Sequence, residues 1–370
     1  MLKVAVVPHG YERLLCRSCL YNYPMLREMK FCMKLKSLIS WKSALCVMLL
    51  LVLVVPTMAS AAQNHSISSG WNLYSMSFDP VDDDNGRCYQ GAVNWTSAAG
   101  TTMTENSSSQ NKCYWRYYPE TWYGLYQKYS TYFTVKVNKD KIEADYPGYS
   151  WAASVSSATH EFGHAQYLGD HDTAGEGVYA TTSIMSYSRN RTTMTTPQSH
   201  DLSDLDALRN PSLASAAEES NGASADFPFY NIDQLLSGKK SDLVIVANVE
   251  SVQEVKENAD PNGPDPEASH QEAVLRIEDN IYGQAKSDTI KLYQSVDKVE
   301  AGKKYLLFLS YRPEIDQYVV SDGVSQTVIA DTAAQMENSK KLNVKIKGIQ
   351  GVYSVDELKQ LLAEKAGKQD

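Results

Sequence analysis

Three of the seven histidines in this 370-residue chain fall within one twelve-residue segment. The segment runs His160-Glu161-Phe162-Gly163-His164-Ala165-Gln166-Tyr167-Leu168-Gly169-Asp170-His171, and its first five residues form the pattern H-E-x-x-H. Residues four apart on a helix lie on the same face, so His160 and His164 can point at one metal ion. Imidazole nitrogen suits Zn²⁺, whose catalytic sites combine three protein ligands with a water molecule. Glu161 can take a proton from that water and later give it to a leaving amine.

Two features that follow the pattern bear on the rest of a metal site. Gly169 can end the helix in a left-handed conformation, and Asp170 or His171 then turns back toward the metal as the third ligand. Further along, the chain reads Ser183-Ile184-Met185-Ser186-Tyr187. The helix end by itself leaves the choice between Asp170 and His171 open.

With these two motifs the chain resembles the metzincin metalloproteases, nearest to their matrixin-like and serralysin-like groups. The family motif is H-E-x-x-H-x-x-G-x-x-H followed by a Met-turn, and the resemblance covers residues 63–210. It implies that Met185 forms an apolar floor under the zinc and that Tyr187 lies near the metal and the oxyanion. The segment 198–208 is similar to the start of the C-terminal helix in that fold.

The chain departs from the family pattern at the third ligand. The family glycine lies seven residues after the first histidine, where this chain has Tyr167, and the third ligand lies ten after, where it has Asp170. One interpretation inserts a residue near 166–167 and keeps His171 as the ligand. The other has Asp170 bind at the standard spacing. We favour His171, because neutral imidazole is the commoner third ligand; a third interpretation is a degraded, inactive site.

The site requires a helix and supporting strands, and the sequence predicts both. Ser156 or Ser157 can cap the helix, and apolar residues such as Phe162 supply its contacts. The alternating segment 133–138 predicts a strand ahead of the helix. The aromatic-rich segment 114–133 is better explained as rings that fill a core than as a surface for stacking ligands.

The N-terminus is typical of an export signal. Residues 44–55 form an apolar run, with lysines ahead of it and Ala59-Ser60-Ala61 behind it. A basic region, a short apolar core and a small-x-small exit predict a signal peptide over residues 1–61, cleaved after about Ala61. The run is shorter than the roughly 20 residues that a membrane span needs, which disfavours an uncleaved anchor.

Removing residues 1–61 changes the composition that matters. The full chain has 35 Lys and Arg against 44 Asp and Glu, and the mature chain has 27 against 42, a net charge of −15. This acidity disfavours nucleic-acid binding, because polyanions need a concentrated basic surface. Cys88 and Cys113 remain, and an even pair in an exported chain predicts one disulfide. We expect a secreted monomer with no stable membrane span after cleavage.

Beyond residue 210 the composition changes twice. Residues 211–228 are small, polar and turn-forming, which predicts a linker. Residues 229–370 are predicted to form a small all-β, OB-like barrel with a C-terminal helix capped by Ser354 and Glu357. This part resembles accessory domains of exported Gram-positive bacterial proteins. Its expected strands are 243–252, 273–279, 289–293, 304–310 and 317–320.

Two further groups of residues could serve as metal ligands. The carboxylates between Asp79 and Gly86 lack a distal bidentate glutamate, so a solvated turn explains them better than a calcium loop, although Ca²⁺ stays open as a second cofactor. His65, His200 and His270 are isolated in the sequence. We interpret them as structural or solvent-exposed, with His200 kept as a minor candidate.

These observations predict an α+β protein. A metzincin-type catalytic domain over residues 62–210, with a twisted mixed sheet and an active-site helix, precedes the barrel. The resemblance implies a secreted zinc endopeptidase that hydrolyses protein or peptide substrates. Zinc would be held by His160, His164 and His171, with Glu161 as general base and then acid. The alternative is a catalytically inactive exported binding protein on the same scaffold.

Overall fold

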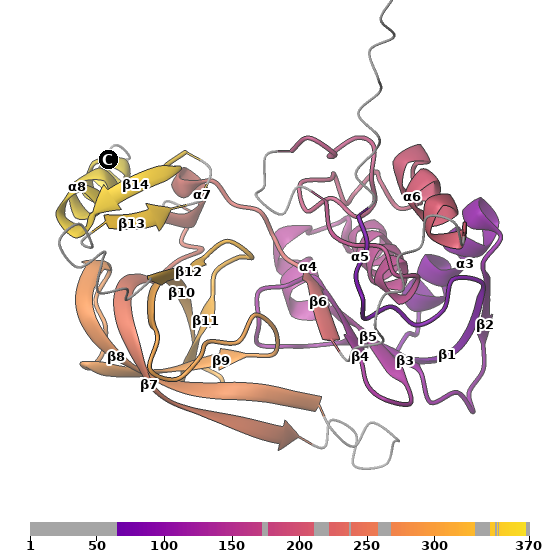
Figure 1. The fold of residues 1–370 in the computed structure, drawn as a ribbon, viewed down its shortest axis with the longest axis horizontal. Coiled ribbons are helices and arrows are strands. Elements are labelled where there is room, and N and C mark those ends of the chain that lie inside the picture. Colours follow the sequence, from indigo (N-terminus) through magenta and orange to yellow (C-terminus); the bar gives the residue numbers. More distant parts are fainter. Residues whose placement is uncertain are drawn as a thin grey trace, which may run out of the picture. The chain divides into compact units, whose positions relative to one another are not determined.

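The described residues belong to one unit, Asn64–Asp370, with a mixed α+β architecture (Figure 1). A computed structural model describes residues 65–171, 177–210, 222–236, 238–257, 268–329, 341–344, 346 and 348–367. The predicted signal peptide, residues 1–61, lies outside the described residues, as does the first part of the predicted linker, residues 211–221. Among the described helices, none is long and apolar enough to cross a membrane.

The first sheet carries the candidate site. Its strand order is β2-β1-β3-β5-β4-β6, and β4 runs antiparallel to both its neighbours while the remaining pairs are parallel. The strands are β1 (Ser75–Val81), β2 (Thr102–Glu105), β3 (Lys112–Arg116), β4 (Gly124–Lys128), β5 (Phe133–Asn138) and β6 (Gly222–Asp226). The strand predicted over 133–138 is confirmed as β5, and the sheet is mixed, as expected.

Helices α3 and α5 pack tightly together over this sheet (Figure 1). A Cβ added at Gly91 of α3 would lie 2.7 Å from Cβ of Ala158, so only glycine lets the helices approach this closely. The indole N–H of Trp95 donates to the carbonyl of Thr159 at 2.7 Å. The helices of this half are α3 (Arg87–Ala99), α4 (Lys139–Asp145), α5 (Ser150–Ala165) and α6 (Ser199–Arg209).

The helix that carries His160 and His164 begins earlier than predicted. It starts at Ser150, so Ser156 and Ser157 lie within α5 and the predicted cap is wrong. Both serines are fully buried. Ser157 Oγ donates to Asp226 Oδ2 at 2.9 Å, and Ser156 Oγ accepts from Arg189 Nε at 3.0 Å. The two serines predicted to cap the helix therefore form hydrogen bonds with buried charged side chains instead.

Aromatic rings fill the core beneath the helices, as predicted. Tyr126 and Phe133 are fully buried in this core, whereas Trp122 is buried in a separate cluster with Phe227 and Val296. Tyr117, in the same segment, is 63% exposed and is an exception. The aromatic segment therefore serves mainly as core.

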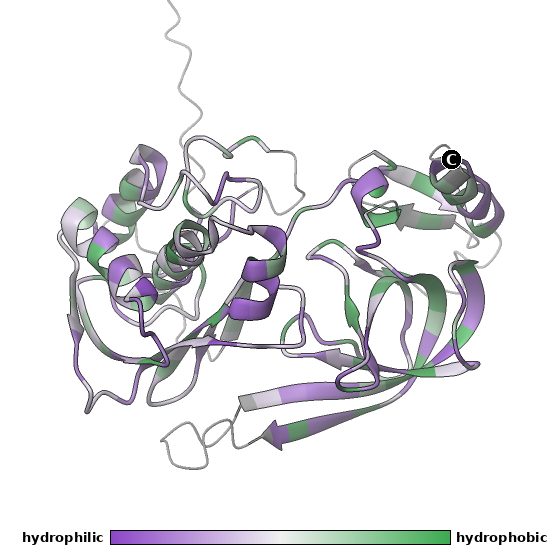
Figure 2. Ribbon diagram, turned by 180° about the vertical axis from the view of Figure 1, so that it is seen from behind, coloured by the Kyte–Doolittle hydropathy of each residue, from purple (hydrophilic) through white to green (hydrophobic). Residues whose placement is uncertain are grey.

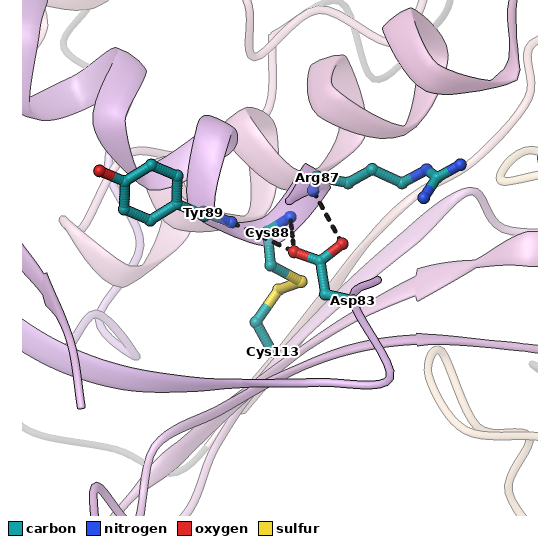
Figure 3. The surroundings of a disulfide bond; sticks show 5 residues. All are labelled: Asp83, Arg87, Cys88, Tyr89 and Cys113. Atoms are coloured by element: carbon teal, nitrogen blue, oxygen red, sulfur yellow. Dashed lines mark hydrogen bonds between the residues drawn. A yellow bond between two sulfur atoms is a disulfide. The ribbon is translucent and has the colours of Figure 1, made fainter. Parts of the chain in front are cut away.

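A disulfide between Cys88 and Cys113 joins α3 to β3 and confirms the predicted pair (Figure 3). Asp83 lies beside it and caps α3, because its carboxylate accepts the backbone N–H groups of Arg87 at 2.7 Å and Cys88 at 2.8 Å. Asp79 forms an ion pair with a lysine of β3. These carboxylates already bind protein groups, so we derive no calcium site from this turn.

The predicted linker is wrong at its C-terminal end. Residues 222–226 form β6, which pairs antiparallel with β4 and places Asp226 opposite Gly124. The small side chains of this segment predicted a flexible linker, but in the structure they allow β6 to pack closely against its neighbours. A Cβ added at Gly222 would lie 2.8 Å from Cβ of Ser69. A strand from within the predicted linker therefore completes the first sheet.

The second large sheet closes into a five-stranded barrel. Its order is β11-β9-β8-β7-β10-β12, with an additional β10–β11 pairing that closes the ring and β9 parallel to β11. The strands are β7 (Leu243–Glu257), β8 (Ala268–Tyr282), β9 (Thr289–Gln294), β10 (Lys304–Arg312), β11 (Gln317–Val320) and β12 (Gln326–Ile329). Each of the five expected strands is present, and β7 and β8 are longer than predicted. Figure 2 shows apolar and polar residues interspersed along these strands.

A small layer packs against the barrel through a shared apolar cluster. It comprises α7 (Ile232–Leu236), β13 (Lys341–Val344), β14 (Gly351–Ser354) and α8 (Val355–Gly367). The predicted capping box at α8 is confirmed. The backbone N–H of Ser354 donates to Glu357 Oε2 at 2.7 Å, and the N–H of Glu357 donates to Ser354 Oγ at 3.1 Å.

Candidate metal centre

Helix α5 brings His160 and His164 together, with their Nε2 atoms 3.1 Å apart. The other ring nitrogen of each is held by a backbone carbonyl. His160 Nδ1 lies 3.0 Å from the oxygen of Ile184, and His164 Nδ1 lies 2.8 Å from the oxygen of Leu168. Such contacts fix the tautomer and the ring orientation of metal-binding histidines. Both Nε2 atoms are therefore available to one ion.

The third group at this centre is Asp170. Its Oδ1 lies 3.0 Å from His160 Nε2 and 3.3 Å from His164 Nε2. Zinc with tetrahedral ligands at about 2.0–2.1 Å separates neighbouring donor atoms by roughly 3.3 Å, so the three atoms fit this ion. The favoured set of His160, His164 and His171 is not brought together. The alternative set of His160, His164 and Asp170 is brought together.

The backbone at Tyr167 explains this outcome. Tyr167 has φ +70°, so a tyrosine adopts the left-handed conformation at the position of the family glycine and no residue is inserted. Its ring fills the space beside Gly70, where any Cβ would collide with it. Its carbonyl accepts the N–H of Ile67 at 3.0 Å. Gly169, predicted to end the helix, has no positive φ; its N–H donates to the carbonyl of His65 at 3.0 Å.

Glu161 lies beside the metal ligands in the interior. It is fully buried, and neither carboxylate oxygen has a hydrogen-bond partner. Gly124 of β4 approaches so closely that a Cβ there would collide with Oε1 of Glu161. Burial raises the pKa of Glu161 well above its ordinary value, and the nearby carboxylates of Asp226 and Asp170 add to the shift.

The segment 183–187, which resembles a Met-turn, is anchored by α6. Oγ of Ser183 donates to Asp201 Oδ1 at 2.5 Å, and the backbone N–H of Ile184 donates to Asp201 Oδ2 at 2.8 Å. Met185 is fully buried under α5, where a Cβ added at Gly163 would lie 2.5 Å from its sulfur. The segment 183–187 therefore lies against the helix that carries both histidines.

The second oxygen of Asp170 is held in place by two hydroxyls. Tyr187 Oη donates to Asp170 Oδ2 at 3.0 Å, and Ser224 Oγ of β6 donates to it at 2.7 Å. Burial alone would raise the pKa of Asp170, but the imidazoles of His164 and His160 lower it well below its usual range. This carboxylate is thus oriented with Oδ1 toward the histidines, and the structure places Tyr187 beside the centre.

Sequence reasoning missed a buried charge network around the centre. Arg189 Nη2 donates to Asp226 Oδ2 at 2.6 Å, and Arg191 Nε donates to the same oxygen at 3.2 Å. Burial alone would raise the pKa of Asp226, but the two arginines hold it far below its usual range. Arg189 Nη1 also lies 3.3 Å from His160 Nδ1. Two arginines directly after Tyr187 were the available signal, whereas Asp226 lay in the predicted linker.

His171 belongs to a second cluster, together with His65, His200 and Asp204. Asp204 Oδ2 lies 3.4 Å from His171 Nε2, 3.6 Å from His65 Nδ1 and 3.8 Å from His200 Nε2. His65 and His200 are isolated in the sequence but meet in the fold, and the minor candidate His200 lies in this second cluster. His270 lies elsewhere and stacks on Tyr293 in the barrel, with ring centroids 4.1 Å apart.

Comparison with known proteins assigns the chain to no family. No protein-family model matches it, and no curated protein matches it either. What the site can do follows from its own groups: two oriented imidazoles, an oriented carboxylate and a buried glutamate next to them.

Proposed function

We propose that this protein is a secreted zinc endopeptidase of metzincin type, with zinc held by His160, His164 and Asp170. The observation that carries the proposal is the convergence of the two Nε2 atoms and Asp170 Oδ1, 3.0 to 3.3 Å apart, beside the buried carboxylate of Glu161. Three protein ligands leave one position open, which distinguishes catalytic from structural zinc sites. The mixed sheet and the buried active-site helix support the metzincin resemblance.

The residues of the centre can divide the steps of peptide hydrolysis among them. Zinc, when bound, lowers the pKa of a coordinated water and polarises the scissile carbonyl. Glu161 accepts the water proton as the water oxygen bonds to the carbonyl carbon, and delivers it to the amide nitrogen as the C–N bond breaks. Tyr187, whose hydroxyl donates to Asp170, can donate instead to the carbonyl oxygen as negative charge develops there.

Two features support export and an accessory barrel. The disulfide fits an oxidising compartment, as expected for a protein with a signal peptide. The closed five-strand order, with β9 parallel to β11, supports an OB-like barrel. We assign the barrel an accessory role and the substrate to the first half of the chain, where the metal ligands lie.

Zymography of the mature chain, residues 62–370, on a protein substrate tests this proposal. Wild type should cleave, a zinc chelator should stop cleavage and added zinc should restore it. Glu161→Gln should keep its zinc and lose about 10³-fold in rate, the scale of general-base catalysis. Tyr187→Phe should lose less. A zinc-loaded chain that cleaves nothing, both as wild type and in every variant in which β6 is loosened, or a fully active Glu161→Gln, would show the proposal to be wrong.

One observation favours the second candidate, a catalytically inactive exported binding protein. His160, Glu161 and His164 are all fully buried, and β6 contacts Asp170 through Ser224. A zinc-loaded chain that binds peptides without cleaving them, in every variant in which β6 is loosened, would favour this candidate.

A further inference from the structure

The second cluster gathers four side chains from three separate segments of the chain. His65 lies ahead of the first strand, His171 follows α5, and His200 and Asp204 lie one turn apart on α6. One ligand atom from each lies within 4.8 Å of every other. His200 and Asp204 share a helix face because they are four residues apart.

The polar atoms of this cluster are buried and unsatisfied. His171 and Asp204 are fully buried, and the side chains of His65 and His200 are 19% and 18% exposed. Six atoms lack a hydrogen-bond partner: His65 Nδ1, His171 Nδ1, His171 Nε2, His200 Nε2, Asp204 Oδ1 and Asp204 Oδ2. Buried polar groups are almost always hydrogen-bonded or bound to a metal, because burying them alone is costly. So many unsatisfied atoms at one point call for a ligand.

The chemistry of the cluster matches a divalent transition metal. Three imidazoles and one carboxylate supply the nitrogen and oxygen ligands that Zn²⁺ prefers. The ring of Tyr179 stacks on His200 at 5.0 Å and lies 4.8 Å from His171, which shields the cluster on that side.

From these residues we infer a second zinc site, made of His65, His171, His200 and Asp204, with a structural role. Four protein ligands fill a tetrahedral site and leave no position for a substrate or water. The ion would tie the segment at His65 and the helix α6 to the residue next to Asp170. It would thereby steady the loop that presents Asp170 to the first centre. The site stands on its own geometry, whether or not the first centre is catalytic.

Metal analysis of the mature chain tests this inference. We expect two zinc ions per chain in wild type, one in His200→Ala and one in His160→Ala, and none in the double variant. The matched control is His270→Ala, which should keep two. Cobalt substitution gives a second readout, because a tetrahedral Co²⁺ band should persist in His160→Ala and vanish when His200→Ala is added.

The outcomes separate the two centres. A wild type with one zinc that His160→Ala removes and His200→Ala keeps would overturn the second site and leave the first intact. Where His200→Ala is too unstable to purify, His65→Gln, at a half-buried ligand, replaces it and should also hold one zinc. Two ions retained in both variants would equally exclude the site.

A separate observation concerns access to the first centre and rests on the proposed function. Strand β6 pairs antiparallel along the edge of β4, next to Glu161 and Asp170. A free strand edge is where an extended peptide binds to a sheet. Ala225 of β6 is buried and shares an apolar cluster with Val296 of the barrel, which backs the strand. We propose that residues 222–226 occupy the place of a substrate and keep the enzyme latent.

Loosening β6 tests latency. Ala223 has an exposed side chain and pairs with Gln127 of β4, so Ala223→Pro places a residue without a backbone donor in this ladder, and Ala223→Ser is the matched control. Cleavage of a short quenched peptide should rise at least tenfold in Ala223→Pro and stay unchanged in Ala223→Ser, with zinc content unaltered in both. An unchanged rate in Ala223→Pro, together with a rate that Glu161→Gln abolishes, would overturn latency alone. No cleavage by any zinc-loaded variant would overturn the proposed function as well.

Discussion

The two halves of the molecule have cores of different kinds. Around α5 the interior holds Glu161, Asp226 and Arg189, all fully or almost fully buried. The barrel interior is a cluster of aliphatic and tyrosine side chains. Among the described residues from 243 onward, Asp322 is the one buried carboxylate. One core holds a network of buried charges, and the other holds a single buried carboxylate.

The difference between the two cores distinguishes residues that stabilise the fold from residues that could carry out chemistry. Replacing buried ion pairs by apolar residues is often neutral or stabilising, so charges in a core are weak evidence for stability. Carboxylates with strongly shifted pKa values, gathered beside candidate ligands, mark a functional site instead. The barrel interior, where the described residues include no such group of carboxylates, consists of aliphatic and tyrosine side chains.

The largest effect is expected from Asp226→Asn. The change leaves Arg189 and Arg191 buried without their carboxylate, and breaking a buried pair in this way costs about 3–5 kcal/mol. Urea unfolding measures the loss. Leu307→Ala in the barrel is the matched control: it should cost about 2–5 kcal/mol but leave the hydrolysis rate per folded molecule unchanged. A loss of less than about 1 kcal/mol in the free energy of unfolding for Asp226→Asn would contradict the proposed difference between the two cores.

Replacing both Cys88 and Cys113 by serine should cost about 2–4 kcal/mol, because the disulfide restricts the unfolded chain. Their sequence separation is 25 residues, and the bond joins α3 to β3. Thermal unfolding with and without a reductant measures the loss, and the reductant should not affect the double variant. A reductant that lowers the melting temperature of both proteins equally would argue against this source of stability.

The barrel should show its own pH dependence through Asp322. Burial raises the pKa of Asp322 to about 6, so the folded state holds this proton more tightly than the unfolded chain. The stability it contributes is complete below about pH 4 and is lost as the pH rises through about 6. Asp322→Asn mimics the protonated acid and should raise stability at pH 7 by about 1–3 kcal/mol. An equal difference from wild type at pH 4 and pH 7 would exclude Asp322 as the source.

The smallest expected effect is a gain in stability. In metal-free protein, Glu161→Gln should raise the free energy of unfolding by about 1–2 kcal/mol, because a buried carboxylate without a partner is costly. Glu120→Gln is the matched control. Glu120 is also buried, but it accepts hydrogen bonds from the N–H of Ser295 at 2.7 Å and its Oγ at 2.9 Å. Its replacement should be neutral or destabilising, and a gain for Glu120 alone would reverse the prediction.

Local patterns in the sequence predicted much of the fold. The helix with His160 and His164, the strand over 133–138, the barrel strands and the capping box each depend on residues close together in the chain. The disulfide followed from a count of two cysteines. Such features need no knowledge of distant contacts.

What could not be predicted depends on distant contacts. Tyr167 takes a left-handed conformation with its ring against Gly70, a contact distant in sequence, and Asp170 rather than His171 faces the histidines. His65 meets His171 only after the N-terminal segment pairs with the chain beyond α5. Strand β6 has the composition of a linker, and only its pairing with β4 reveals it.

The pairing of β6 with β4 also decides where the chain can be cut. A fragment that ends at residue 210 keeps every proposed ligand of both centres but loses β6. The edge of β4 would then be open, and an unpaired edge strand is a template for aggregation. Arg189 and Arg191 would also lose Asp226. A fragment intended to fold by itself should therefore extend past Asp226, to the far end of the segment 211–228 whose composition suggests a linker.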